Sequence, residues 1–147
     1  MYGFSDPHII AQTDHVTLWR ADNVLCVRIH GVLDDAASDR WRAMVTESIS
    51  KQGAPRFIAV DFSHCDPQNS MAARYRSAAF ARDTMKRIEH GIVLTGGTAG
   101  PTVVVRAVLR AIGLPNLDLH TNASAFADAV GSMRKGLKPN PAARLAS

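Results

Sequence analysis

The sequence contains few cysteines, few aromatic residues and no long apolar run. Of its 147 residues, two are cysteines and 6% are aromatic. No apolar run approaches the roughly 20 residues with which a helix crosses a bilayer, so we expect no membrane span. The first 15 residues lack both the basic start and the continuous apolar core of a secretory signal. These absences predict a cytoplasmic protein.

Metal-type spacing is also missing. Cys26 and Cys65 lie in or beside predicted strands, and they share no ligand spacing with each other or with the six histidines. We therefore predict two reduced thiols in the core or at its edge. Neither a metal site nor another cofactor is predicted.

The excess of positive charge is modest. The formal net charge is +4, and residues 134–147, which contain part of this excess and two prolines, are predicted to be a flexible tail. Further basic side chains are expected on helix faces, namely Arg74, Arg76, Arg82, Lys86, Arg87, Arg106 and Arg110. Because no recognition helix or RNA-binding motif accompanies them, we interpret them as solvated and predict no nucleic-acid partner.

Apolar periodicity and turn residues divide the chain into alternating strands and helices. Residues 1–14 are predicted to be an N-terminal extension or edge strand, and 15–133 to be one domain. The predicted strands are 16–19, 24–30, 57–62, 91–94 and 117–120. The predicted helices run from Asp34 or Asp35 to Gly53, over 70–88, over 102–112, and from Thr121 or Asn122 to Met133.

This order of elements predicts the fold class. The first two strands are joined by a short turn and form an antiparallel hairpin, whereas each later strand is followed by a helix, which makes the connections parallel and right-handed. The expected fold is therefore an α/β domain. It has a mixed, mostly parallel sheet of about five strands, an N-terminal antiparallel hairpin and about four helices.

The helix predicted over 70–88 needs one apolar face toward the sheet. The spacing of its apolar residues predicts a buried stripe made by Met71, Tyr75, Ala78, Ala79 and Met85. The basic residues of this helix are expected on the opposite, solvated face.

The most informative segment is the strand 57–62 with the polar residues 63–69 that follow it. Open α/β folds carry their sites at the carboxyl edge of the sheet, where such a loop leads into the next helix. Ser70 opens that helix, and two interpretations of it stay open. Asn69 or Ser70 either serves only as the helix cap, or Ser70 is a phosphorylation site whose phosphate the helix N-terminus tolerates.

Two further segments contain residue types that are common in anion-binding or catalytic sites. Thr95, Gly96, Gly97 and Thr98 begin a glycine-rich loop that leads into a helix, and its amides are a candidate anion-binding site, although no Walker or dinucleotide pattern is present. Residues 63–66 place Ser, His, Cys and Asp in a row. Neighbours on an extended segment point to opposite sides, and no nucleophile elbow surrounds Ser63, so we predict no catalytic residue.

These segments resemble the STAS-like domains, the group of sulfate-transporter and anti-sigma-factor-antagonist domains. Residues 27–34 are similar to the family's strand followed by Gly-x-Leu-Asp, and 58–63 are similar to its Val-x-Asp-Leu-Ser. Segments 91–96, 109–114 and 123–130 follow in the family's order, so the resemblance covers roughly 15–133. In antagonists of this group the motif Asp-Ser-Ser/Thr-Gly begins eight residues after the strand's Asp, and its first serine is phosphorylated by an anti-sigma kinase. Counted from Asp61, the motif falls on residues 69–72, where only Ser70 matches.

Together the residues and the resemblance predict a non-enzymatic, protein-binding regulatory module. Its partner, of a kinase-type or sigma-regulating kind, is expected at Ser63, His64, Asp66, Asn69, Ser70 and Arg74, and Ser70 is the phosphorylation candidate. One alternative is a sensor of a small anion, or a cryptic enzyme, that uses the loop 95–100. Another is a purely oligomeric role as a homodimer.

Overall fold

The strands of the computed structural model, which describes residues 8–96, 110 and 113–139, form a single mixed sheet. The strand order follows the chain, from β1 to β6, and the bounds are β1 His8–Gln12, β2 Val16–Ala21, β3 Val24–Leu33, β4 Phe57–Pro67, β5 His90–Leu94 and β6 Leu117–His120. The pairs β1–β2 and β2–β3 are antiparallel, and β3 to β6 are parallel. The α/β class, the N-terminal hairpin and the mostly parallel sheet are therefore confirmed.

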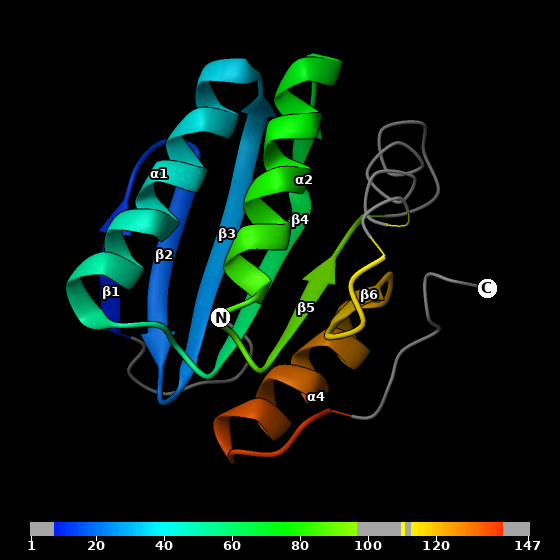
Figure 1. The fold of residues 1–147 in the computed structure, drawn as a ribbon. Coiled ribbons are helices and arrows are strands. Elements are labelled where there is room, and N and C mark those ends of the chain that lie inside the picture. The colour runs from blue at the N-terminus through cyan, green and yellow to red at the C-terminus, as the bar shows by residue number, and fades with distance from the viewer. Residues whose placement is uncertain (1–7, 97–109, 111–112, 140–147) are drawn as a thin grey trace.

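Helices cover both faces of this sheet (Figure 1). Helix α1 (Asp35–Gln52) and helix α2 (Met71–Met85) lie side by side over one face, where a core cluster includes Trp41 and Met85. Helix α4 (Ala123–Arg134) packs on the other face through Phe126 and its neighbours. The two crossover helices α1 and α2 thus bring their N-termini to the same end of the sheet, beyond the carboxyl ends of β3 and β4.

The ends of α1 follow from its sequence. Asp34 is the N-cap, and its side chain accepts a hydrogen bond from the backbone N–H of Ala37 at 2.8 Å. Gly53 ends the helix with φ +84°, a conformation that glycine adopts without a steric penalty. The apolar positions of this helix recur at steps of three and four, and those at Ala37, Trp41, Val45, Ser48 and Ile49 are buried while Met44 is half-buried.

Two strands extend beyond their predicted ends, and one strand is added. Strand β4 continues through 63–67, which had been predicted as a loop, because residues 64–67 pair in parallel with 30–33 of β3. Strand β3 passes Gly31, which has φ +75° and was predicted to end it. The edge strand β1 makes the count six rather than five. Ladder hydrogen bonds use backbone groups, so polar residues can continue a strand past the core.

The predicted inward face of α2 is right for Met85, which is buried, and wrong for its N-terminal half. Met71 is 49% and Tyr75 is 66% exposed, and Ala79 also lies on the outside. Besides the predicted Met85, the buried residues of this helix are Ala73 and Thr84. Small residues such as alanine contribute little to an apolar period, so the sequence pattern allowed the wrong rotation of the helix.

Most of the helix predicted over 102–112 falls outside the described residues. Within the described part of the chain, no helix is both long enough and apolar enough to cross a bilayer. Cys26 is buried and Cys65 is half-buried, and both are free thiols.

Candidate functional site

The first turn of α2 begins at Ser70, which is exposed and has two roles in the structure. Its Oγ accepts a hydrogen bond from the backbone N–H of Ala73 at 3.1 Å, so Ser70 is the N-cap of α2. The same hydroxyl donates to Asp35 Oδ2 at 2.7 Å. The capping interpretation is confirmed by this geometry, and the exposure of the hydroxyl leaves the second interpretation open.

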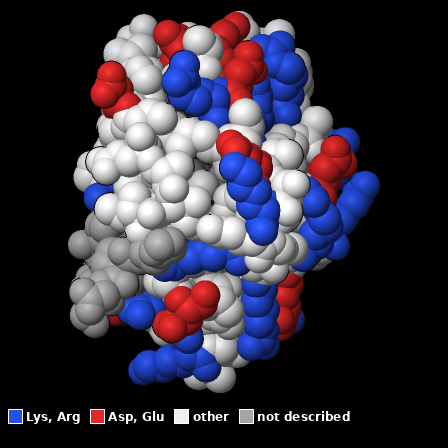
Figure 2. Space-filling view, turned by 90° about the vertical axis from the view of Figure 1, so that its left-hand side faces the viewer, with Lys and Arg blue, Asp and Glu red and all other residues white. Residues whose placement is uncertain are grey.

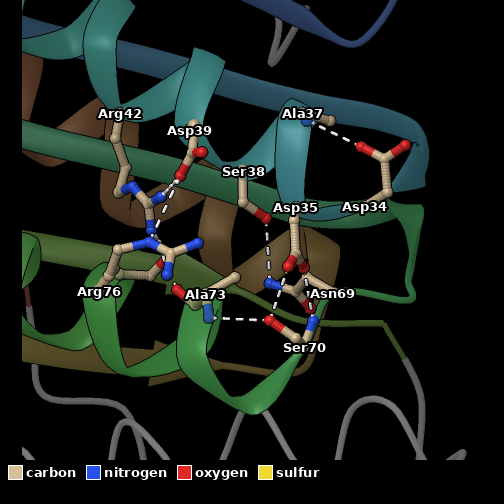
Figure 3. A network of polar contacts seen from close by, with 11 residues as sticks. Asp34, Asp35, Ala37, Ser38, Asp39, Arg42, Asn69, Ser70, Ala73 and Arg76 are labelled. Atoms are coloured by element: carbon tan, nitrogen blue, oxygen red, sulfur yellow. Dashed lines mark hydrogen bonds and ion pairs between the residues drawn. The ribbon is translucent and has the colours of Figure 1, made fainter.

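Asp35 joins the start of α1 to the start of α2. Besides the hydroxyl contact, its Oδ1 accepts a hydrogen bond from the backbone N–H of Ser70 at 2.6 Å. One carboxylate therefore accepts two hydrogen bonds from Ser70 (Figure 3). These two hydrogen bonds stabilise the charged carboxylate and lower the pKa of Asp35, with smaller contributions from Arg76 and Arg42. Asp35 therefore stays ionised while it holds Ser70.

The residues around this pair form a hydrogen-bonded frame between the two helices. Asn69 is buried, donates to Ser38 Oγ at 3.0 Å and accepts from Arg74 Nε at 3.3 Å. Its predicted place on a partner-binding surface is therefore wrong, because the side chain holds α1 and α2 together. Arg42 donates to the carbonyl oxygen of Ala73 at 3.0 Å, which ties the first turn of α2 to α1.

Two of the basic side chains near Ser70 are paired with acid, whereas Arg74 donates to Asn69 and to Met71. Arg42 and Arg76 both contact the carboxylate of Asp39, Arg76 at 3.6 Å (Figure 3). On the face of the molecule that Figure 2 shows, basic and acidic side chains stand beside one another rather than forming a stripe of one sign. Lys86, at the far end of α2, likewise lies 3.7 Å from Asp83.

The predicted residues at the end of β4 surround a buried carboxylate. Asp61 is 1% exposed, and its Oδ1 accepts the hydroxyl of Ser63 at 2.5 Å and the backbone N–H of Ser63 at 2.8 Å. Arg28 donates to Oδ2 at 3.3 Å, and His64 Nε2 lies 3.7 Å from the same oxygen. The Ser63 hydroxyl is thus bonded to a carboxylate and not to an imidazole, which is not the arrangement that activates a serine nucleophile.

Cys65 has no thiolate character. Burial, together with the nearby charges of Asp61 and Asp66, raises its pKa to about 12, and its Sγ donates to the carbonyl oxygen of Phe62 at 3.3 Å. Asp66 and His64 are exposed on the same strand end. The segment 63–66 therefore offers an outer surface with two polar, accessible side chains.

The glycine-rich loop is described only as far as Gly96. Thr95 is buried and its backbone N–H donates to the carbonyl oxygen of His120 at 3.0 Å, so this amide is already used and does not fit the predicted anion site. Gly96 lies close to β4, since a Cβ there would meet the carbonyl oxygen of Ser63 at 3.5 Å. Gly97 and Thr98 lie outside the described residues.

Three residues of this region were not predicted from the sequence. Asp35 had been considered only as an alternative helix cap, and its contact with Ser70 joins positions 35 residues apart. Met71 and Tyr75 were assigned to the core. Their spacing of four residues beside Ser70 was the available signal, since it places both on one face of the helix.

Comparison with known proteins supports the fold. The sequence matches no protein-family model and no curated protein. Among solved structures, the Bacillus cell fate determinant SpoIIAA in its phosphorylated form is similar, with a TM-score of 0.50 and 18% sequence identity. The similarity covers 77% of this chain and 97% of that chain. The mixed sheet, its opening hairpin and its parallel crossovers, together with this similarity, show that the chain has a STAS-like fold.

Proposed function

We propose that this protein is a non-enzymatic regulatory module that binds a partner protein around the first turn of α2, and that phosphorylation of Ser70 switches this binding off. The observation that carries the proposal is the exposed Ser70 hydroxyl at a helix N-terminus, directly beside exposed apolar side chains. A similar fold has been solved in a phosphorylated form, which supports the choice of chemistry.

The proposed partner surface consists of Met71 and Tyr75 on α2 around Ser70, together with His64 and Asp66, which are exposed at the end of β4. Its apolar part is formed by Met71, which is 49% exposed, and Tyr75, which is 66% exposed and lies one turn later on the same side of α2. Tyrosine and methionine are enriched at protein interfaces relative to the rest of the surface.

Phosphorylation would change the contact with Asp35. A kinase that transfers the γ-phosphoryl group of ATP forms an Oγ–P bond at Ser70, releases ADP and removes the hydroxyl proton. Asp35 Oδ2, which accepted that proton at 2.7 Å, then faces a group carrying about −1.5 to −2 charges at pH 7. Two like charges at this distance repel, so the carboxylate has to turn away from Ser70.

The rest of the first turn would tolerate the phosphate. The free N–H groups and the dipole at the N-terminus of α2 favour a negative charge there. Arg74 follows one turn later and is half-buried against Asn69, so its guanidinium is close enough to the cap to contribute charge. The helix is therefore expected to stay folded while the surface around Met71 and Tyr75 becomes strongly negative, and an apolar or acidic partner is released.

The test compares baits that differ by one charge. The full chain is immobilised as wild type, Ser70→Ala, Ser70→Asp and Asn122→Asp, and partners from the native host are quantified by mass spectrometry. Asn122 caps α4 on the opposite face of the sheet and is also exposed, so its variant adds the same charge at a different helix start. Wild type, Ser70→Ala and Asn122→Asp are expected to recover one common protein, and Ser70→Asp at least tenfold less. Equal recovery with Ser70→Asp, or no common protein with any bait, would contradict the proposal.

A further inference from the structure

The hydroxyl group of Ser70 points toward α1. It donates its hydrogen to Asp35 Oδ2 at 2.7 Å, and its oxygen accepts the backbone N–H of Ala73 at 3.1 Å. While the oxygen keeps this cap bond, the direction of the hydroxyl hydrogen is open to a phosphorus atom that replaces it. A phosphate on Ser70 therefore enters the space between the first turns of α1 and α2.

Arg76 and Arg42 lie near this space. In Figure 3 the guanidinium of Arg76 lies between the two helices, and long side chains on a helix lean toward its N-terminus, which for α2 is Ser70. Besides the two hydrogen bonds from Ser70, the charges of Arg76 and Arg42 lower the pKa of Asp35. The carboxylate whose place the phosphate approaches is thus already under the influence of both arginines.

Of these two arginines, only Arg76 can change its partner at little cost. Arg42 is buried, and it donates to the carbonyl oxygen of Ala73 at 3.0 Å and to Ser77 Oγ at 2.7 Å besides its contact with Asp39. The side chain of Arg76 is 51% exposed and lies 3.6 Å from Asp39. Because exposed ion pairs contribute little to stability, Arg76 is readily moved from Asp39 to a stronger anion.

Arg74 is directed to the other side of Ser70. Its Nε donates to Asn69 Oδ1 at 3.3 Å, and its Nη1 donates to Met71 Sδ at 3.5 Å. These contacts hold its guanidinium beside the residues that precede and follow Ser70, rather than beside Asp35. Arg74 thus carries the same charge close to the same helix start in a different direction, which makes it a matched control for Arg76.

We propose that a phosphate on Ser70 is bound by Arg76, which leaves Asp39 to do so. This presupposes the proposed phosphorylation of Ser70 and adds the residue that receives the phosphate. A guanidinium donates two parallel hydrogen bonds to a phosphate, and hydrogen bonds between charged groups are stronger than neutral ones. The phosphate dianion therefore competes successfully with the single contact that Asp39 offers.

The exchange changes how α1 and α2 are joined. The contacts of Asp35 with Ser70 and of Asp39 with Arg76 both cross from one helix to the other, whereas the phosphate contact lies within α2. The buried hydrogen bond from Arg42 to the first turn of α2 is unaffected, so the helices stay packed. Because Arg76 is taken from a carboxylate, the surface still gains the whole charge of the phosphate.

The test measures the second pKa of the phosphate by ³¹P NMR in the full chain, prepared with phosphoserine at position 70 by genetic-code expansion. A guanidinium contact favours the dianion and lowers this pKa from its ordinary value of about 6. Arg76→Gln should raise the pKa by about 0.5 or more, and Arg74→Gln, which removes the same charge, by less than about 0.2. Arg76→Lys should restore only part of the lowering, because an ammonium group lacks the planar fork of a guanidinium.

The proposal is overturned if the phosphate titrates in Arg76→Gln as it does in the unsubstituted chain. It is also overturned if Arg74→Gln raises the pKa as much as Arg76→Gln does or more. The titration needs no partner protein, so its failure leaves the release of a partner by phosphorylation untouched. A phosphoserine chain that still captures its partner would instead refute the proposed function and leave the contact with Arg76 standing.

Discussion

Replacing Ser70 with alanine should destabilise the protein by a predictable amount. The change removes the cap acceptor for the backbone N–H of Ala73 and the hydroxyl that Asp35 holds, whereas the backbone N–H of Ser70 still donates to Asp35. Loss of a serine cap costs about 1 kcal/mol. For a chain of this size that corresponds to a fall in melting temperature of about 2–4 °C.

Urea unfolding followed by tryptophan fluorescence measures this loss, because Trp19 and Trp41 are both buried in the folded protein. Two further substitutions separate the cap from the contact with Asp35. Ser70→Asn keeps a cap acceptor and offers an amide N–H to Asp35, so it should unfold within about 0.5 kcal/mol of wild type. Ser70→Asp keeps the cap but sets a second carboxylate against Asp35, so it should be less stable than Ser70→Asn.

The difference between the asparagine and aspartate variants should vanish when Asp35 is also changed to asparagine, because the repulsion then has no partner. An alanine variant as stable as wild type would refute the capping role. Equal stability of Ser70→Asn and Ser70→Asp in the presence of Asp35 would refute the electrostatic contact on which the switch depends.

Three other predictions concern the partner surface, the core and a buried histidine. Tyr75→Glu should abolish partner capture while changing the free energy of unfolding by less than about 0.5 kcal/mol, since Tyr75 is 66% exposed. Arg82→Glu at the far end of α2 is its control, and capture lost in both would contradict the assigned surface. Trp41→Ala should cost about 3–5 kcal/mol in urea unfolding, since the ring is 6% exposed, and a cost below about 1 kcal/mol would contradict its place in the core. Burial lowers the pKa of His120, an effect that Asp118 partly opposes, so the folded state favours the neutral imidazole. The contribution of His120 to the free energy of unfolding should therefore be fully present above about pH 6.5 and decrease as the pH falls below it. His120→Gln should reduce this dependence of the free energy of unfolding on pH. An unchanged pH dependence in His120→Gln would contradict the assignment to His120.

The elements that were predicted well had signals at both ends. For α1 the sequence supplies a cap at Asp34, a stop at Gly53 and large apolar residues between them, and these fix both the bounds and the rotation of the helix. The central part of β4 is apolar on nearly every residue, which matches a strand covered by helices on both faces. Hydrophobic periodicity is informative where the residues are large.

The elements that were predicted poorly lacked such signals. The inward side of α2 consists mostly of small residues, so the exposed Met71 and Tyr75 dominated the pattern and turned the predicted helix the wrong way. The extension of β4 through 63–67 depends on backbone pairing with β3. The polar side chains of this segment give no pattern from which that pairing could be predicted.

Only the local part of the candidate site could be predicted from the sequence. Ser70 could be placed at a helix start because caps are local, and its cap geometry is as expected. The carboxylate of Asp35 reaches Ser70 only because two crossover helices are packed in parallel, a relation between residues distant in sequence. Asn69 was misassigned because its partner Ser38 is equally distant.

The central claim is that the Ser70 hydroxyl is a site of regulated phosphorylation, and phosphopeptide mapping of the protein isolated from its own cells tests it most directly. Growth and stationary phases are sampled with phosphatase inhibitors present, and the Ser70→Ala strain is the control. The account predicts a phosphate on Ser70 in at least one phase, with its fraction changing between phases. A peptide that contains Ser70, is recovered in high yield and is unmodified in every phase would contradict it.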